Sequence, residues 1–318
     1  MILPRTLILS VIVLLAACGA EDQPASGEAP PGTESQKALV VTSNYPLFFF
    51  ASQLSEGIDA APEIIFPDID GDPAFWIPSA EQIQLLQSAD AVILNGAGAE
   101  SWLNLISIDQ RRLVDTSVSI KDRLIPLEDS VQHQHGPEGE HSHQGTAFTT
   151  WLDPQLAVAQ ARSVTDALIE LAPSGETDFR NNLVKLEQTL AQLDTQLAAV
   201  FVKLEGQPVL FSHPVYQYLQ RRYEIDGESV HWEPEQEPTT SAWISLQKIT
   251  AAHPARMMIW EDKPLPSTAE RLNNGGIVST QFHTAANTPA QGDYLSVMRG
   301  NAERLEALLS LAETTGER

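Results

Sequence analysis

One stripe of apolar residues in the middle of the chain constrains the fold more than any other feature. Between residues 179 and 204, apolar side chains follow one another at spacings of four and three residues in alternation: Phe179, Leu183, Leu186, Leu190, Leu193, Leu197, Val200 and Leu204. Such spacing places all of them on one side of an α-helix. Gly206, followed by Pro208, predicts the end of this helix. A helix over residues 176–204 would be roughly 43 Å long, so it is long enough to connect two separate lobes.

Strand and helix patterns alternate on both sides of this stripe. The predicted strands are residues 39–42, 63–66, 91–94, 209–211, 229–231, 257–260 and 277–280. The predicted helices are residues 47–55, 80–88, 102–106, 215–223, 243–252, 268–273 and 293–311. Strands that alternate with helices indicate βαβ units on a parallel sheet. We therefore predict an α/β fold with two lobes, residues 38–172 and 207–318, joined by one long rigid helix within residues 173–206. A free coiled coil has the same apolar spacing, but a single isolated segment between two α/β halves favours a connecting helix.

The N-terminus has the pattern of a bacterial lipoprotein signal. Arg5 precedes an apolar run over residues 7–17, which is shorter than the about 20 residues that a membrane-spanning helix needs. Residues 15–18 read Leu-Ala-Ala-Cys and match the lipobox, in which the cysteine becomes the acylated first residue. An ordinary signal peptide with a chance cysteine is the alternative. We predict a signal peptide over residues 1–17, lipidation of Cys18, and attachment to the periplasmic or cell-surface side of a bacterial membrane.

The composition limits the partners of the chain. Residues 18–37 are rich in Gly, Pro, Ser and Glu, so we predict a disordered tether there. The net charge of −23 argues against a nucleic-acid partner, because binding phosphate needs a basic surface. A negative field raises the local concentration of cations, although the same charge could serve solubility alone. The sequence has no His-Glu-x-x-His, no Gly-x-Ser-x-Gly, no P-loop and no Gly-x-Gly-x-x-Gly after a strand, so nothing indicates an enzyme.

The densest cluster of metal-ligating residues is a histidine-rich segment. Residues 132–145 read QHQHGPEGEHSHQG and contain His133, His135, His141 and His143. The surrounding Gly, Pro, Gln and Ser predict a mobile loop. Neutral imidazole is a good ligand for zinc, copper and nickel, and a flexible loop can fold around such an ion. The segment therefore predicts metal handling, and an ordinary polar loop is the alternative.

Two further histidines follow predicted strands of the second half. His213 follows the strand over residues 209–211, and His283 follows the strand over residues 277–280. Open α/β sheets bind ligands at the carboxyl ends of their strands. A lone histidine is more often structural, but two at equivalent strand ends support each other as ligands.

Other polar residues have a weaker claim to a ligand role. His231 and His253 are predicted to be structural, since the first lies inside a strand pattern and the second closes a helix before Pro254. Four carboxylates lie near predicted strand ends or loops: Asp72, Asp153, Glu233 and Glu261. They could complete a metal site, but caps, hinge contacts or solvated charges are the more common roles of such residues.

Several motifs occur in an order that resembles a known family. They are VVTSNYPL at residues 40–47, Pro78-Ser79 followed by ADAVILNG at residues 89–96, Trp151-Leu152-Asp153-Pro154, the strand end at His213, and Gly292-Asp293-Tyr294-Leu295. Together they resemble the metal-binding receptors of zinc and manganese ABC importers, the zinc-uptake or TroA-like group. The resemblance implies two α/β lobes with a metal in the cleft, and delivery to a membrane permease powered by an ATPase. A histidine-rich acidic loop before Trp-Leu-x-Pro is similar to the zinc branch, so the implied cargo is Zn²⁺, and we expect a monomer.

The ligands that the family implies carry over only in part. The family takes one histidine from each of three places and a carboxylate from a fourth. The segment 72–77, before Pro78-Ser79, has no histidine, and the position two residues before Trp151 is Thr149. His213 matches the third place, and His283 occupies the fourth. We therefore hypothesise a rebuilt site.

In the rebuilt site, His213 and His283 are joined by two of the histidines in the loop: His133, His135, His141 and His143. A site of four nitrogen ligands favours Zn²⁺ over manganese, which prefers oxygen.

Two alternatives keep the same fold. One is a receptor for a chelated metal or a small organic ligand, with Trp76, Trp151 and Trp232 as walls of its cleft. The other is a surface lipoprotein that binds proteins or cells without transport.

Overall fold

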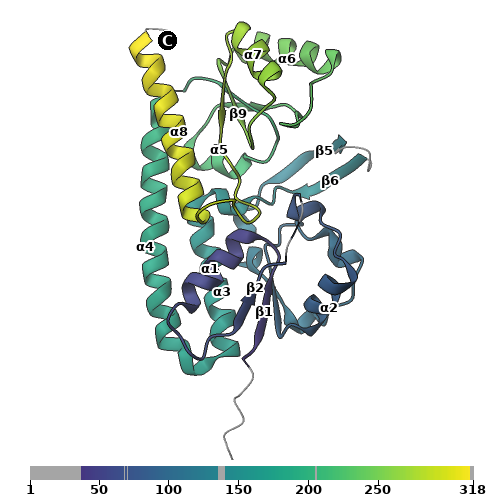
Figure 1. Cartoon of the computed structure of the whole chain (residues 1–318), viewed down its shortest axis with the longest axis vertical. Coiled ribbons are helices and arrows are strands. Elements are labelled where there is room, and N and C mark those ends of the chain that lie inside the picture. The colour runs from purple at the N-terminus through teal and green to yellow at the C-terminus, as the bar shows by residue number, and fades with distance from the viewer. Residues whose placement is uncertain (1–36, 68, 70, 135–139, 205, 316–318) are drawn as a thin grey trace, which may run out of the picture. The chain divides into compact units, whose positions relative to one another are not determined.

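The computed structural model describes residues 37–67, 69, 71–134, 140–204 and 206–315 (Figure 1). Cys18 and the predicted signal peptide and tether up to residue 36 lie outside the described residues. The chain from Lys37 to Arg318 makes up one compact unit. Within the described ranges, no helix is both long and apolar enough to cross a membrane.

The N-terminal lobe is built on a parallel sheet. Its strands are β1 (Leu39–Thr42), β2 (Glu63–Ile65), β3 (Ala91–Leu94) and β4 (Leu113–Asp115), in the spatial order β2-β1-β3-β4. In the register of the sheet, Val40 lies opposite Ile64 on one side and Ala91 on the other. The central strand β3 is buried along its whole length and β1 along most of it, as expected for apolar strands that are covered on both faces.

Helices of two kinds surround this sheet. The α-helices are α1 (Tyr45–Ser55), α2 (Ala80–Ser88) and α3 (Pro154–Leu171), and the short 3₁₀ helices are η1 (Pro73–Phe75), η2 (Ser101–Asn104), η3 (Gln110–Arg112), η4 (Thr116–Arg123), η6 (Thr150–Leu152) and η7 (Pro173–Gly175). The local sequence sets where the α-helices begin. Asn44 and Asp153 cap α1 and α3 with their side chains, and Ser79 with Gln82 forms a capping box at α2.

The histidine-rich segment belongs to a hairpin in the residues that are described. Strands β5 (Pro126–Gln134) and β6 (Glu140–Thr146) pair antiparallel, with His133 opposite His141 and Val131 opposite His143. His135 lies outside the described residues. The prediction of a loop over residues 132–145 was therefore wrong for the described residues 132–134 and 140–145, which belong to strands. The Gly- and Pro-containing composition had suggested unpaired backbone groups, but pairing between the strands satisfies them.

The C-terminal lobe has a second parallel sheet. Its strands are β7 (Val209–Phe211), β8 (Gly227–Ser229), β9 (Met257–Trp260) and β10 (Val278–Gln281), in the spatial order β10-β9-β7-β8. Its α-helices are α5 (Gln217–Tyr223), α6 (Thr240–Ala252), α7 (Pro266–Asn274) and α8 (Tyr294–Thr315). Strands β7 and β9 at the centre are buried throughout.

The apolar stripe lies on α4 (Glu176–Phe201), which a 3₁₀ turn, η8 (Val202–Leu204), extends. All eight stripe residues are buried except Leu183, which is partly buried. Helix α4 packs against α1 and α3 of the N-terminal lobe and against α8 from the end of the chain, which runs beside it (Figure 1). The predicted fold class, two α/β lobes with one long helix, is confirmed.

Several local predictions differ from the structure. Helix α3 and strand β4 were not predicted. Residues 101–104 form a 3₁₀ helix rather than an α-helix over 102–106. Strand β8 ends at Ser229, two residues before the predicted end, because only Gly227–Ser229 continue the ladder with β7. The last difference matters most, since it places His231 beyond the carboxyl end of β8.

Candidate metal centre

His213 lies between two carboxylates at the carboxyl edge of the C-terminal sheet. Its Nε2 is 3.3 Å from Oε1 of Glu233, and its Nδ1 is 3.1 Å from Oε1 of Glu261. The sheet order explains this arrangement, because β7, which leads to His213, lies between β8 and β9, which lead to the two glutamates. The His213 residue is 6% exposed, so these carboxylates are its main electrostatic neighbours.

The surroundings of His213 favour its protonated form in the metal-free protein. Burial alone would lower the pKa of His213, but hydrogen bonds and charges from Glu233 and Glu261 outweigh it and raise the pKa to about 10. The imidazolium thus neutralises two carboxylates that would otherwise repel each other. A metal cation is the other species that can neutralise this set of donors, since it replaces the proton on nitrogen.

His283 lies at the next part of the same edge, after β10. Asn301 holds its backbone on both sides, because Asn301 Oδ1 accepts from the His283 N–H at 2.9 Å and Asn301 Nδ2 donates to the His283 carbonyl at 2.8 Å. Burial and the charge of Arg304 lower the pKa of His283. A neutral imidazole is the form that binds metals. Glu261 is a neighbour of both His213 and His283.

A pocket of about 910 Å³ lies beside these residues and is lined by both lobes. Its walls include Asp72, Thr149 and Trp151 from the N-terminal lobe, and Glu261 and His283 from the C-terminal lobe. Three of the places where the family resemblance implies ligands therefore meet at one pocket. They are the start of the segment 72–77 at Asp72, then Thr149, and His283. His213, the fourth, contacts the pocket wall through Glu261.

The two N-terminal places carry no imidazole and make structural bonds. The Asp72 side chain accepts from the N–H of Ala74 at 2.8 Å and caps η1. The Thr149 hydroxyl donates to the carbonyl of Val215 at 2.5 Å.

Thr149 is part of a set of contacts between the lobes that we call the lobe clasp: Thr149 with Val215, the Trp151 indole N–H with the carbonyl of Thr284 at 2.7 Å, and the Tyr294 hydroxyl with the carbonyl of Trp151 at 2.7 Å.

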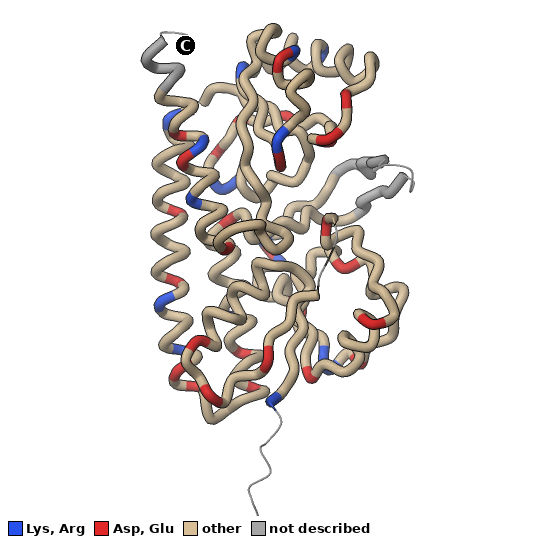
Figure 2. The backbone as a smooth tube through the Cα atoms, viewed as in Figure 1, with Lys and Arg blue, Asp and Glu red and all other residues tan. Residues whose placement is uncertain are grey.

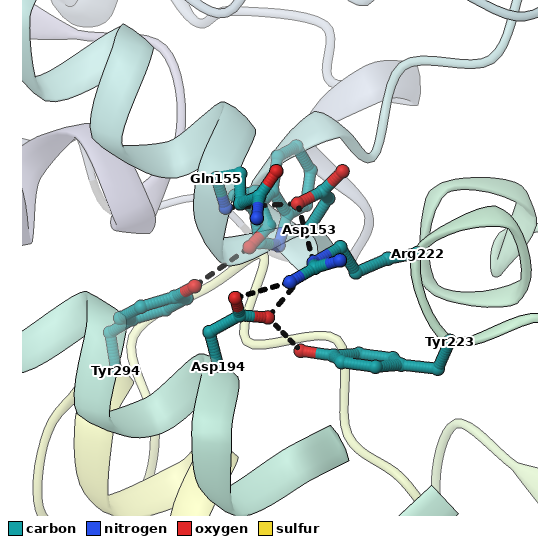
Figure 3. Close-up of polar contacts among 7 residues, drawn as sticks. Asp153, Gln155, Asp194, Arg222, Tyr223 and Tyr294 are labelled. Carbon is teal, nitrogen blue, oxygen red and sulfur yellow. Dashed lines mark hydrogen bonds and ion pairs between the residues drawn. The ribbon is translucent and has the colours of Figure 1, made fainter. Parts of the chain in front are cut away.

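An ion-pair network lies next to the lobe clasp (Figure 3). Arg222 of α5 donates to both oxygens of Asp194 on α4, at 2.9 and 2.5 Å, and lies 3.9 Å from a carboxylate oxygen of Asp153. The Tyr223 hydroxyl donates to Asp194 at 3.0 Å. Because Asp153 caps α3, this network joins the N-terminal lobe, the connecting helix and the C-terminal lobe.

The other candidate residues, His231, His253 and three tryptophans, have different positions in the structure. His253 is structural as predicted, since it caps α6 and its Nε2 lies 3.0 Å from the carbonyl of Val209. The prediction for His231 was wrong in its premise, because the residue is exposed beyond β8 and its ring centre is 6.4 Å from that of His213. Of the three tryptophans considered as walls, only Trp151 is among the residues that line this pocket, whereas Trp76 and Trp232 are buried in hydrophobic clusters.

Glu233 and Glu261 belong to the site, although the sequence supported a ligand role for them only weakly. Asp72 and Asp153 do cap helices, as the common interpretation of such carboxylates predicts. The two glutamates instead flank His213. In the sequence, the only indication was that both glutamates follow a strand shortly after its end. That they both lie beside His213 depends on the order of the strands in the sheet. Among the residues that the structure describes, no three His, Cys, Asp or Glu side chains converge on a point where they could hold a metal ion.

Two α/β lobes, one long connecting helix, and a pocket lined by both lobes with ionisable side chains at the strand ends are the features of a protein that binds a small solute between its lobes. The model of the family described as "Zinc-uptake complex component A periplasmic" matches residues 40–308, and the chain belongs to this family. The description of the family is that of a periplasmic component of a zinc-uptake complex.

Similar proteins agree with this membership. The zinc-binding lipoprotein AdcA of Streptococcus pneumoniae is 24% identical over 281 residues, which cover 85% of this chain and 55% of that protein. This chain therefore spans about half the length of that relative. The high-affinity zinc uptake system protein ZnuA of Bacillus subtilis is 24% identical over 272 residues, which cover 83% and 82% of the two chains. The Zn(II)-bound ZnuA-like domain of Streptococcus pneumoniae AdcA has the same fold, with a TM-score of 0.68 at 20% identity over 86% of this chain and 98% of that chain.

Proposed function

We propose that this protein is a zinc receptor, anchored through acylated Cys18 to the outer side of a bacterial membrane, which delivers Zn²⁺ to an ABC-type permease. The observation that carries the proposal is His213, buried between two carboxylates at the edge of a pocket that both lobes line. Membership of the zinc-uptake family and the zinc-binding names of its relatives support the identity of the cargo.

The charge of the chain suits this function. Asp and Glu number 42 against 19 Lys and Arg, and Figure 2 shows acidic residues in both lobes. Such a field concentrates cations near the protein, and the effect weakens with ionic strength. The field does not select zinc, so selectivity has to come from the donor atoms at the site.

The ligand set predicted from the sequence stays a hypothesis within this proposal. It joins His213 and His283 with two histidines of the hairpin: His133, His135, His141 and His143. The hairpin could also act as an accessory that captures zinc without contributing to the final site. A zinc titration of the intact chain, of a chain that lacks residues 132–145, and of the His213→Ala variant separates the two cases. Loss of tight binding in both altered proteins supports a shared site, and loss in the His213 variant alone makes the hairpin an accessory.

The proposal itself is tested by the metal content of the purified protein. We expect about one tightly bound zinc per chain after purification without chelators, removable by a chelator and restored by added Zn²⁺. Protein that contains no zinc and binds none on titration would refute the receptor function. The delivery step is tested separately, by binding of the zinc-loaded chain to membranes that contain an ABC-type zinc permease from the same bacterium.

A second candidate is a receptor for a chelated metal or small organic ligand. Two observations favour it: the pocket of about 910 Å³ is much larger than one ion needs, and Ala74 and Thr149 stand where the family resemblance implies N-terminal ligands. Pockets of roughly 300–1,000 Å³ are typical of small-molecule sites. Mass spectrometry of the protein released under denaturing conditions would detect such a ligand, and a zinc-only preparation would exclude it.

A further inference from the structure

The carboxyl edge of the C-terminal sheet carries metal-ligating side chains at every strand. In the spatial order of the sheet, β10 leads to His283, β9 to Glu261, β7 to His213, and β8 to both His231 and Glu233. At the pocket, the N-terminal lobe offers less, because the Asp72 side chain caps η1, Ala74 has no donor side chain and the Thr149 hydroxyl donates to Val215. Among the residues at the pocket and the sheet edge, most donors for an ion therefore belong to the C-terminal lobe.

The segment His231-Trp232-Glu233 is held in a defined orientation. Trp232 is 4% exposed and packs against Trp243 and Trp260, with ring centres 4.7 and 6.2 Å apart. Its backbone N–H donates to the carbonyl of Ser212 at 2.8 Å, so the segment continues beside the chain that leads to His213. Neighbouring residues of an extended chain point to opposite sides. The buried indole of Trp232 thus turns His231 and Glu233 together away from the core, towards His213.

The spacing of His213 and Glu233 fits two ligands of a tetrahedral zinc ion. With metal–ligand distances of about 2.0–2.1 Å, two ligands of a tetrahedral site lie about 3.3 Å apart. The distance between Nε2 of His213 and Oε1 of Glu233 is 3.3 Å. Two imidazoles on one such ion have ring centres about 5 Å apart, and the rings of His213 and His231 are 6.4 Å apart. The three side chains do not converge on one point as they stand, so binding requires the exposed side chain of His231 to rotate towards the ion.

We propose that the C-terminal lobe alone holds the zinc ion, through Nε2 of His213, the carboxylate of Glu233 and the imidazole of His231. Glu261 is then a positioning residue, which lies within hydrogen-bond distance of Nδ1 and keeps the proton on that nitrogen so that Nε2 faces the ion. Three protein ligands leave a fourth position for water or for an incoming ligand. An open position suits cargo, because an ion that is passed to a permease has to exchange its ligands.

This inference rests on the proposed zinc function and replaces the ligand set predicted from the sequence. His283 and the hairpin histidines become dispensable for tight binding, whereas His231, Glu233 and Glu261 become necessary.

The test compares variants of the full chain by competition for Zn²⁺ with a chromophoric chelator. Loss of an outer-shell partner typically costs roughly 10–100-fold in metal affinity. We expect Glu261→Gln to weaken zinc binding within that range and His231→Ala and Glu233→Gln to weaken it by more than about 100-fold. Glu235→Gln, two residues beyond Glu233 and exposed, is the matched control and should bind as the unchanged chain does. His283→Ala and a chain without residues 132–145 should also stay within about 3-fold of it.

The outcomes separate failure of the receptor function from failure of the one-lobe site. If the unchanged chain binds no zinc, both the receptor function and this inference fail. If the unchanged chain binds zinc and His231→Ala and Glu233→Gln bind equally well, the receptor stands and the one-lobe site is refuted. Circular dichroism and thermal unfolding of the metal-free variants identify any that misfold. If His231→Ala misfolds, His231→Gln takes its place because it preserves most of the volume, and Glu233→Gln already preserves the volume of Glu233.

Discussion

The proton on His213 should make the metal-free protein lose stability in mildly alkaline solution. Its imidazolium lies between Glu233 and Glu261, at 3.3 and 3.1 Å. These carboxylates raise the pKa of His213 to about 10 against the opposing effect of burial. Replacement of His213 by Gln removes the titrating group and leaves a polar side chain in its place.

The magnitude follows from the difference between the folded and unfolded pKa. The pKa rises from 6.5 in the unfolded chain to about 10 in the folded protein, so the folded state retains a proton that the unfolded chain releases. This contribution to the free energy of unfolding is fully present below pH 6.5 and is lost as the pH rises through 10. Between about pH 7 and about pH 9, proton linkage at 1.36 kcal/mol per pKa unit gives a loss of about 2.5 kcal/mol. The side chain is only 8% exposed, so solvent screening reduces this value little.

The assay is urea unfolding of chelator-treated protein at both pH values, for the unchanged chain, His213→Gln and a control, His253→Gln. The lysine and tyrosine side chains are the same in all three proteins, so the difference between the unchanged chain and His213→Gln isolates the contribution of His213. We expect the pH-dependent loss in the unchanged chain and in the control, and not in His213→Gln. An equal loss in all three proteins would refute the account of His213 as a cation held by two carboxylates.

Three further predictions concern the fold that supports the site. Leu190 is 0% exposed in the stripe of α4, so Leu190→Ala should lower the free energy of unfolding by about 2–5 kcal/mol, whereas Val184→Ala, at a side chain that is 52% exposed, should change it by less than about 0.5 kcal/mol; urea unfolding measures both. Burial raises the pKa of Glu100 to about 7, against hydrogen bonds from Ser43, Asn95 and Gly96 that lower it. Stability of up to about 3 kcal/mol, fully present below the ordinary pKa of 4.5, should therefore be lost as the pH rises through about 7, and the difference between the unchanged chain and Glu100→Gln across this range should reveal it. Arg222→Ala should cost about 1.5–3 kcal/mol because it leaves Asp194 without its charged partner, whereas Arg180→Ala, which breaks an exposed pair with Glu176, should cost less than about 0.5 kcal/mol; equal losses would show that the Arg222 network adds nothing to stability.

The architecture could be predicted because its signals are local. Apolar runs over residues 39–42, 91–94, 209–211 and 257–260 coincide with β1, β3, β7 and β9. Each run is fully or mostly buried, which is why no alternation was needed to recognise it. The stripe from Phe179 to Leu204 likewise specified the long helix α4, which packs against helices of both lobes. Helix α3 escaped prediction because several of the side chains that it buries are small: Ala157, Ala161 and Ala167.

The site could be predicted only in part because its signals are not local. Strand order along the chain is β7, β8, β9, whereas in space β7 lies between β9 and β8. Glu233 and Glu261, which are 28 residues apart in sequence, therefore meet at opposite sides of one imidazole. No spacing rule gives that arrangement. The sequence identified His213 and His283 as strand-end residues, but the partners of His213 became visible only when the order of the sheet was known.

The contacts that join the two lobes are made by other residues than the donors proposed for zinc, and this affects how an ion would leave the protein. In a receptor whose ligands come from two lobes, the ion itself connects the lobes, and opening the lobes removes ligands from it. In this chain the lobe clasp connects them through Thr149, Trp151 and Tyr294, and none of these contacts involves the donors proposed for zinc. If the C-terminal lobe alone holds the ion, release has to proceed by exchange at the open fourth position rather than by withdrawal of a lobe. Zinc binding should then leave the arrangement of the lobes, and hence the radius of gyration in solution scattering, unchanged, and a compaction on adding Zn²⁺ would indicate that donors from the N-terminal half also reach the ion.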